Sequence, residues 1–264
     1  MHTVRIDGPI EWQTCNVYPL ADWHIGDIHC SQAEIDAQIE MVKSDPYGLV
    51  VLNGDLMNTA VRSSVSDIYG EQMKPMEQIL HLVGLLKPIA DRIICATTGN
   101  HEERIYRDDG VDIMRLVCRE LGIEDRYHPD GVLVFLRFGA VRSHKSKGYR
   151  DGVQRRLFTL YATHGAGAGR KEGAKAIRLA DMAATVDADV YIHSHSHLPM
   201  ILSESYFRVN VGNSSAQEVE KLFVTTGSSL MYGGYGQRKE FKPNSRRNPV
   251  IHLSACSGVA TATL

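Results

Sequence analysis

Five short apolar stretches of this chain each end in an aspartate, an asparagine or a histidine. They are rich in Val, Ile, Leu and Tyr and are followed by turn-forming residues, a pattern typical of buried strands. The stretches read CNVYPLADWHIGDIH, LVVLNGD, ICATTGNHE, LYATHG and DVYIHSHSH. Ligand sites in open α/β sheets lie beyond the carboxyl ends of the strands. We therefore expect the polar residues at these ends to surround one site.

Helix-like stretches alternate with strands in the first half of the chain. Apolar residues recur at helical spacing over residues 31–45, 76–92 and 110–122. After about residue 130 the pattern changes to several strands and one clear helix, over residues 174–186. The sequence therefore predicts an α/β fold in which a two-sheet β-sandwich is flanked by α-helices. We expect one domain over residues 1–264.

Composition fits a soluble globular protein. Of 264 residues, 43% are hydrophobic and 23% are charged, and the net charge of -2 gives no global reason to expect a polyanionic partner. The five cysteines are odd in number and widely spaced, so they do not indicate a disulfide framework. No apolar run approaches the roughly 20 residues of a membrane span. We expect a cytoplasmic protein without a membrane partner; the sequence gives no oligomeric state.

The polar residues at the strand ends offer oxygen and nitrogen ligands and no thiolate. Such a mixture suits Mn²⁺, Fe²⁺ or Zn²⁺ and argues against an iron–sulfur cluster or a thiolate zinc site. Seven ligands exceed the needs of one tetrahedral ion. Two ions about 3.5–4 Å apart, bridged by one carboxylate and a water or hydroxide, would use them all.

In order and spacing these segments resemble the calcineurin-like metallophosphoesterase family. The family pattern is D-x-H, G-D, G-N-H-D/E, a single H before glycine, and G-H-x-H, each placed just after a strand. The matching segments are DIH at 27–29, GD at 54–55, GNHE at 99–102, HG at 164–165 and SHSH at 194–197. Ser194 and Ser196 replace the usual glycine and threonine of the last segment, and neither change removes a ligand.

The resemblance implies two divalent metal ions, with manganese favoured and iron, zinc or nickel as alternatives. Each ion would have three ligands of its own and would share Asp55 as the bridge. The implied sets are Asp27, His29 and His197 for one ion, and Asn100, His164 and His195 for the other. Asp55 and His101 would be the catalytic residues, with His101 beside the leaving group as a proton donor or a stabiliser of charge.

The implied reaction is hydrolysis of a phosphate ester by in-line attack of a hydroxide that bridges the metals. Two divalent ions lower the pKa of a bridging water from ~15.7 towards neutrality, so no covalent nucleophile is required. The leading substrate is a phosphodiester, in DNA or a nucleotide. A phosphomonoesterase and a catalytically silent metal-binding scaffold are the alternatives; the presence of every expected ligand and of His101 argues against the scaffold.

Three residues outside the ligand set are candidate substrate contacts: Asn58, Arg104 and Arg170. Guanidinium groups match phosphate oxygens in geometry, although a turn cap at Asn58 or a solvated arginine would explain these residues equally well. The glycine-rich segments 164–175 and 224–243 together resemble phosphoesterases encoded by phages and prophages.

Two histidines and one basic segment lie outside these assignments. If the strand stays regular, His193 shares a face with His195 and His197, and we expect it to pack in the interior or beside the ligands. His24 is expected to be a surface residue or a satisfied polar one. The basic, glycine-rich stretch at residues 232–249 is expected to be a loop with a mobile tip.

Overall fold

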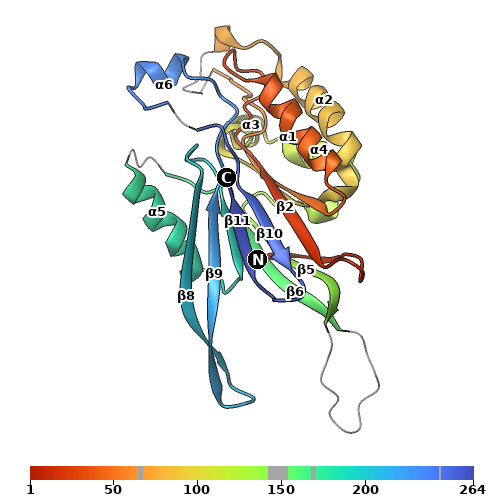
Figure 1. Cartoon of the computed structure of the whole chain (residues 1–264). Helices are drawn as coiled ribbons and strands as arrows, with labels where there is room; N and C mark the ends of the chain where they lie inside the picture. The colour runs from red at the N-terminus through yellow and green to blue at the C-terminus, as the bar shows by residue number, and fades with distance from the viewer. Residues whose placement is uncertain (63, 65–67, 142–153, 168–170, 244) are drawn as a thin grey trace.

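The protein is a sandwich of two β-sheets with helices on both outer faces (Figure 1). The computed structural model describes residues 1–62, 64, 68–141, 154–167, 171–243 and 245–264. This architecture confirms the predicted α/β class and the flanking helices. Within the described residues, no helix has the length and apolarity needed to cross a membrane.

The first sheet has five strands in the order β11-β10-β2-β3-β4. Strands β2, β3 and β4 run parallel, and β3, which lies between the other two, is buried along its whole length, as a parallel strand covered on both faces must be. Its strands are β2 (Thr14–Leu20), β3 (Gly48–Asn53), β4 (Ile93–Thr97), β10 (Val250–Ser254) and β11 (Ala260–Thr263). The helices α1 (Gln32–Ser44), α2 (Pro75–Leu86), α3 (Asn100–Asp109) and α4 (Ile113–Glu120) follow or connect them.

The second sheet has six strands in the order β1-β5-β6-β7-β9-β8. It contains β1 (His2–Asp7), β5 (Val132–Val141), β6 (Gln154–Ala162), β7 (Val190–His193), β8 (Met200–Asn210) and β9 (Ser215–Thr225). Helix α5 (Glu172–Asp181) covers its outer face, where Leu179 packs in one cluster with Tyr191 and Phe223. The remaining elements are α6 (Gly234–Arg238) and the 3-10 helices Ile68–Gly70, Lys87–Arg92, Glu124–Arg126 and Met182–Ala184.

Separate apolar clusters hold these layers together. The cluster between the sheets joins residues such as Val51 of β3 and Phe138 of β5, both fully buried. A second cluster joins the other face of the five-stranded sheet to α1, α2 and α4, through residues such as Ile35, Leu82 and Val117. Since both faces of the parallel strands are covered, polar side chains collect where these strands end.

Candidate metal centre

Asp and His side chains form one continuous cluster beyond the carboxyl ends of strands from both sheets. The cluster consists of three overlapping groups, and within each group the nearest ligand atoms lie within 4.8 Å of one another. The groups are Asp22, His24 and His197; His24, Asp55 and His101; and Asp55, His164 and His195. His24 and Asp55 each belong to two groups, and this sharing joins the three.

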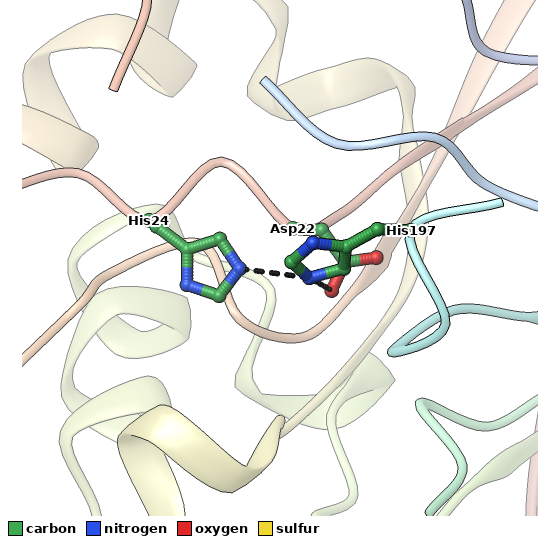
Figure 2. Close-up of side chains that lie close together, drawn as sticks. All are labelled: Asp22, His24 and His197. Carbon is green, nitrogen blue, oxygen red and sulfur yellow. Dashed lines mark hydrogen bonds and ion pairs between the residues drawn. The ribbon is translucent and has the colours of Figure 1, made fainter. Parts of the chain in front are cut away.

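The group of Asp22, His24 and His197 lies just past strand β2 (Figure 2). The Nε2 atoms of His24 and His197 face each other at 3.1 Å, and His197 Nε2 lies 3.3 Å from Asp22 Oδ1. In a hydrogen bond only one of the two facing nitrogens can carry the proton. Two neutral imidazoles and a carboxylate can instead direct three lone pairs at one cation. Burial lowers the pKa of His24 well below its usual value, and this favours the neutral imidazole that binds metals.

Asp22 is fully buried, and only one of its carboxylate oxygens receives hydrogen bonds. Oδ2 accepts from the backbone N–H of His195 and from the Thr226 hydroxyl, each at 3.1 Å. Oδ1, and likewise Nδ1 of His24, is buried without a hydrogen-bond partner among the described residues. An unsatisfied buried carboxylate oxygen is costly in a folded protein. A cation beside Oδ1 would remove that cost.

Asp55 stands at the centre of the cluster and directly follows β3. Its Oδ1 accepts the backbone N–H of His101 at 2.8 Å, and its Oδ2 lies 3.2 Å from His164 Nε2. Burial alone would raise the pKa of Asp55, but the His164 and His101 imidazoles outweigh burial and hold this pKa well below its usual value. Asp55 is therefore a carboxylate that stays ionised although it is 1% exposed.

Asn100 contacts two of the imidazoles, those of His164 and His195, which form a group with Asp55. Its Oδ1 lies 2.7 Å from His195 Nδ1 and 3.3 Å from His164 Nε2. His164 Nδ1 donates to the Asn53 carbonyl at 2.7 Å, so Nε2 is the ring nitrogen that faces Asp55 and Asn100. One amide oxygen, two imidazole nitrogens and the Asp55 carboxylate thus converge.

Glu102 and two glycines position this part of the cluster. The buried Glu102 carboxylate accepts the backbone N–H groups of Asp55, Met57 and Gly99 at 2.9–3.0 Å. A Cβ atom on Gly54 would lie 2.5 Å from the backbone nitrogen of Gly99, and one on Gly99 would overlap Asp55 Oδ1. Larger residues at these two positions would force β3 and the start of α3 apart.

Backbone strain is concentrated in the same cluster. Asp22, His24, Asp55, His195 and His197 all have positive φ, between 51° and 64°. Non-glycine residues in this left-handed region cost of order 1–3 kcal/mol each, and such positions persist where function requires them. Five of them in one cluster indicate a binding site that the rest of the fold holds in place.

His101 is more accessible than His24, the other imidazole of the group that contains His24, Asp55 and His101. Its Nδ1 donates to the Asn58 carbonyl at 3.1 Å, and its Nε2 lies 3.9 Å from Asp55 Oδ2. The Thr59 hydroxyl donates to the His101 carbonyl at 2.6 Å, so both ends of the residue are fixed. Burial lowers the pKa of His101, while Asp55 acts in the opposite direction. The net effect lowers this pKa, and Nε2 is the ring nitrogen that the Asn58 carbonyl leaves open for proton exchange.

The structure brings most of the predicted ligands together, but Asp27 and His29 do not join them. Among the described residues, no group of potential ligands within 4.8 Å contains either of these two. Asp27 Oδ1 accepts the backbone N–H of His29 at 2.7 Å, which closes a local turn, and the His29 ring lies against Gly233 and Gly234. Their place is taken by Asp22 and His24.

The expectation that His24 is a surface or satisfied residue is wrong, because His24 is 2% exposed and its Nδ1 has no hydrogen-bond partner in the part of the chain that the structure describes. A signal for this pair was present in the sequence. Asp22 and His24 also form an Asp-x-His segment, and it begins two residues after β2, whereas Asp27 lies seven residues after it. Distance from the strand end would have favoured the nearer pair.

The three predicted substrate contacts have different surroundings. Asn58 is buried and donates through its amide to Glu71. Arg104 is buried on α3, where burial lowers its pKa and the carboxylates of Asp55 and Glu102 act against that effect. Arg170 lies outside the described residues. Asn58 and Arg104 thus line the interior beside the cluster rather than the solvent.

His193 packs beneath the cluster. It is the last residue of β7 and is 7% exposed, and its ring occupies the space that a Cβ on Gly165 would need. Burial and the neighbouring His164 lower the pKa of His193 to about 4. Since β7 ends here, the regular alternation that would place His193 on one face with His195 and His197 stops at this residue.

The donor set fits divalent cations. Its carboxylate, amide and imidazole ligands are those that Mn²⁺, Fe²⁺ and Zn²⁺ accept. Asp22 Oδ1, which receives no hydrogen bond from the described residues, and the Nε2 atoms of His24 and His197 lie close enough together to bind one cation.

Several solved structures are similar to this chain. Solved structures with similar folds include a predicted phosphoesterase from Streptococcus pneumoniae TIGR4 (13% identity, 95% of this chain and 97% of that chain covered, TM-score 0.34). Others are a metallophosphoesterase from Sphaerobacter thermophilus (12%, 94% and 87%, 0.41) and a Vps29 complexed with zinc from Entamoeba histolytica (12%, 94% and 97%, 0.36). These TM-scores lie below 0.5 and carry no argument about activity. No curated protein matches the sequence significantly.

The family model for calcineurin-like phosphoesterases matches residues 23–199, which is more than half of the chain and includes all of the cluster except Asp22. The chain belongs to the calcineurin-like phosphoesterase family.

Proposed function

We propose that this protein is a hydrolase that uses two divalent metal ions to cleave phosphate esters. The observation that carries the proposal is the sharing of Asp55 and His24 between overlapping ligand groups. One position has Asp22, His24 and His197 around it, and the other has Asn100, His164 and His195. We assign the bridging role to Asp55, because it lies in one group with His24 and in another with His164 and His195.

When bound, the two ions would lower the pKa of a water molecule towards neutrality and would bind phosphoryl oxygens. The chain's own contribution is to hold the ligands rigidly and to supply a proton. His101 has Nδ1 fixed by the Asn58 carbonyl, so Nε2 is the atom that gives a proton to the leaving oxygen. Buried Glu102 keeps the Asp55 backbone and the start of α3 in register through three N–H groups.

The leading substrate class is a phosphodiester. In the proposed arrangement His101 would stand beside the leaving group, and protonation of an alkoxide or nucleoside leaving oxygen is the step that such a group assists. Mn²⁺ is the favoured metal, because oxygen and imidazole ligands in equal measure suit it.

The proposal is tested with metal-stripped protein to which Mn²⁺, Fe²⁺, Zn²⁺ or Ni²⁺ is returned. We expect two ions per chain by elemental analysis and hydrolysis of bis(p-nitrophenyl) phosphate that a chelator abolishes. Faster turnover of p-nitrophenyl phosphate would identify a phosphomonoesterase instead. Two bound ions with hydrolysis of neither ester would identify a metal-binding scaffold, and a single ion at saturation would contradict the shared Asp55.

A further inference from the structure

A basic segment lies beside the cluster and takes no part in the chemistry above. This segment, called the strap here, comprises the described residues of 227–249. It carries one acidic residue, Glu240, and five basic ones, in a chain whose net charge is -2. The basic residues are Arg238, Lys239, Lys242, Arg246 and Arg247, all exposed. The strap thus concentrates positive charge that the whole-chain sum conceals.

The first end of the strap is tied to the cluster, and its two ends are tied to each other. It leaves β9 where the Ser229 backbone N–H donates to the Asp22 carbonyl at 3.1 Å, and Gly227 N–H donates to Asn248 Oδ1 at 2.7 Å, which closes its base. Between these points Met231 N–H donates to the His29 carbonyl at 2.8 Å. In Figure 1 its helix α6 lies at the same end of the sandwich as α3.

Two exposed ion pairs hold the strap across this end of the molecule. Lys242 Nζ lies 3.0 Å from Glu172 Oε1 at the start of α5, and an Arg246 nitrogen lies 3.3 Å from Glu34 Oε1 on α1. Exposed pairs of this kind are weak and screened by salt. A ligand phosphate can therefore compete with either carboxylate for its cation.

Helix α5 places further cations on the other side of the cluster. Lys175 Nζ donates at 2.7 Å to the carbonyl of Ser196, the residue between His195 and His197. Arg178 donates to the carbonyl of Ala166, in the loop that follows His164. Positive charge thus flanks the cluster on the β6–β7 side as well as on the Asp22 side.

The strap also exposes large apolar side chains between its cations. Tyr232 is 50% exposed, Met231 46% and Phe241 38%. Aromatic rings interleaved with basic residues bind unstacked bases and the phosphates between them, whereas a duplex offers no free base faces. A substrate with a single phosphate would reach the metal ligands without touching most of these cations.

We propose that the strap and α5 form a binding surface for single-stranded nucleic acid, whose backbone crosses the metal cluster. The inference rests on the proposed function, since it names the substrate class of that site. Phosphates on either side of the one at the cluster contact the strap and α5, and bases stack on Tyr232.

The test uses full-length, Mn²⁺-loaded protein and a fluorescein-labelled phosphorothioate oligothymidylate, which keeps its charge but resists hydrolysis. Arg238→Gln/Arg247→Gln should weaken binding about tenfold at low salt and reduce the slope of log affinity against log salt by about 1.4. Tyr232→Ser should weaken binding at least about fivefold with the slope unchanged, because stacking is not electrostatic. The matched control is Lys87→Gln/Arg119→Gln, which removes two exposed charges from segments without cluster residues and should change affinity less than twofold.

Several results would overturn the inference. The first is a loss of oligothymidylate affinity in the strap variants that is no larger than in the control variant. The second is tighter binding of a duplex of equal length, and the third is competition by polyglutamate as strong as that by the oligothymidylate. Hydrolysis of bis(p-nitrophenyl) phosphate by the same variants keeps the two proposals apart. If the strap variants show unchanged turnover of this small ester and unchanged oligonucleotide binding, the proposal for the strap is wrong and the proposed function stands. If the wild type does not hydrolyse the ester, the proposed function is wrong, and oligonucleotide binding by the strap is still measured directly.

Discussion

The carboxylates of Asp45 and Asp22 lie at opposite ends of strands β2 and β3, and their surroundings differ. At the amino end, Asp45 accepts hydrogen bonds from Asn16 Nδ2 at 2.7 Å, the Tyr18 hydroxyl at 2.8 Å and the Tyr47 backbone at 2.8 Å. At the carboxyl end, Asp22 Oδ1 and His24 Nδ1 have no hydrogen-bond partner among the described residues, and both residues have positive φ.

This contrast indicates that the carboxylate at one end of the two strands stabilises the fold, whereas the carboxylate at the other end serves ligand binding. Three hydrogen bonds to a carboxylate offset the desolvation cost of its partial burial, so this carboxylate contributes to the stability of the fold. A buried carboxylate with a free oxygen and a strained backbone opposes folding and is retained where a ligand completes it. Substitutions at the amino end should therefore change the free energy of unfolding, and those at the carboxyl end should change metal content and turnover.

The largest effect is expected at Asp55. Asp55→Asn keeps the shape and the acceptor for the His101 N–H but removes the charge that the two proposed ions would share. We expect kcat/KM for bis(p-nitrophenyl) phosphate to fall at least about a thousandfold and bound Mn²⁺ to fall below two per chain. Turnover within tenfold of the wild type, measured at saturating Mn²⁺, would remove Asp55 from the site.

A paired comparison of Asp22 and Asp27 sharpens the contrast and decides between two Asp-x-His segments. Asp22→Asn should lower kcat/KM several hundredfold and weaken the binding of one Mn²⁺, because it alters a converging ligand. Asp27→Asn should stay within about tenfold, since Asp27 closes a turn.

Metal-free Asp22→Asn should also unfold at a denaturant midpoint no lower than the wild type, because a partly unsatisfied buried charge is removed. The reverse order of activities would restore Asp27 as the ligand. A lower unfolding midpoint in metal-free Asp22→Asn would show that Asp22 serves folding, and the contrast between the two strand ends would fail.

His101 should affect turnover without affecting metal content. His101→Gln should lower kcat about a hundredfold, within the range for loss of a proton donor, and leave two Mn²⁺ per chain. The loss should shrink with a substrate whose leaving group needs no proton. A loss of metal in this variant would make His101 a ligand, which its place in one group with His24 and Asp55 permits.

The smallest effects are expected at Asp45. Asp45→Ala should lower the free energy of unfolding by about 2 kcal/mol, because three donors lose their acceptor, and kcat should not change. Exposed Asp91→Ala is the matched control and should cost less than about 0.5 kcal/mol.

The same carboxylate gives a pH dependence. Burial opposes the ionised form, but hydrogen bonds from Asn16, Tyr47 and Tyr18 prevail and lower the pKa of Asp45 in the folded protein. A lowered folded-state pKa stabilises the protein above the unfolded value of about 3.9, and this contribution is lost as pH falls through the folded value. Unfolding of the wild type and Asp45→Asn should therefore converge in acid, and a constant difference from pH 6 to pH 3 would contradict the assignment.

The sequence by itself predicted the sandwich, the family and most of the cluster. Segments such as Gly54–Asp55 and Asn100–His101 follow apolar runs directly, so the strand end and the ligand are fixed by adjacent residues. It did not predict β1, β9, β10 or β11; of these, the short strands β1 and β10 pair with partners far along the chain, since β1 joins β5 and β10 joins β2. A short strand with few buried residues has no local signal strong enough to reveal such a partner.

Only the tertiary structure decided which Asp-x-His segment enters the cluster. Asp22 N–H donates to the Gly54 carbonyl and His24 N–H to the Asp55 carbonyl, both at 3.1 Å, so β3 holds this segment in its left-handed conformation. The end of β7 at His193 was likewise set by packing, against Gly165. The local sequence shows which potential ligands are present. Hydrogen bonds from the neighbouring strand determine which of these residues adopts the backbone conformation that directs its side chain into the cluster.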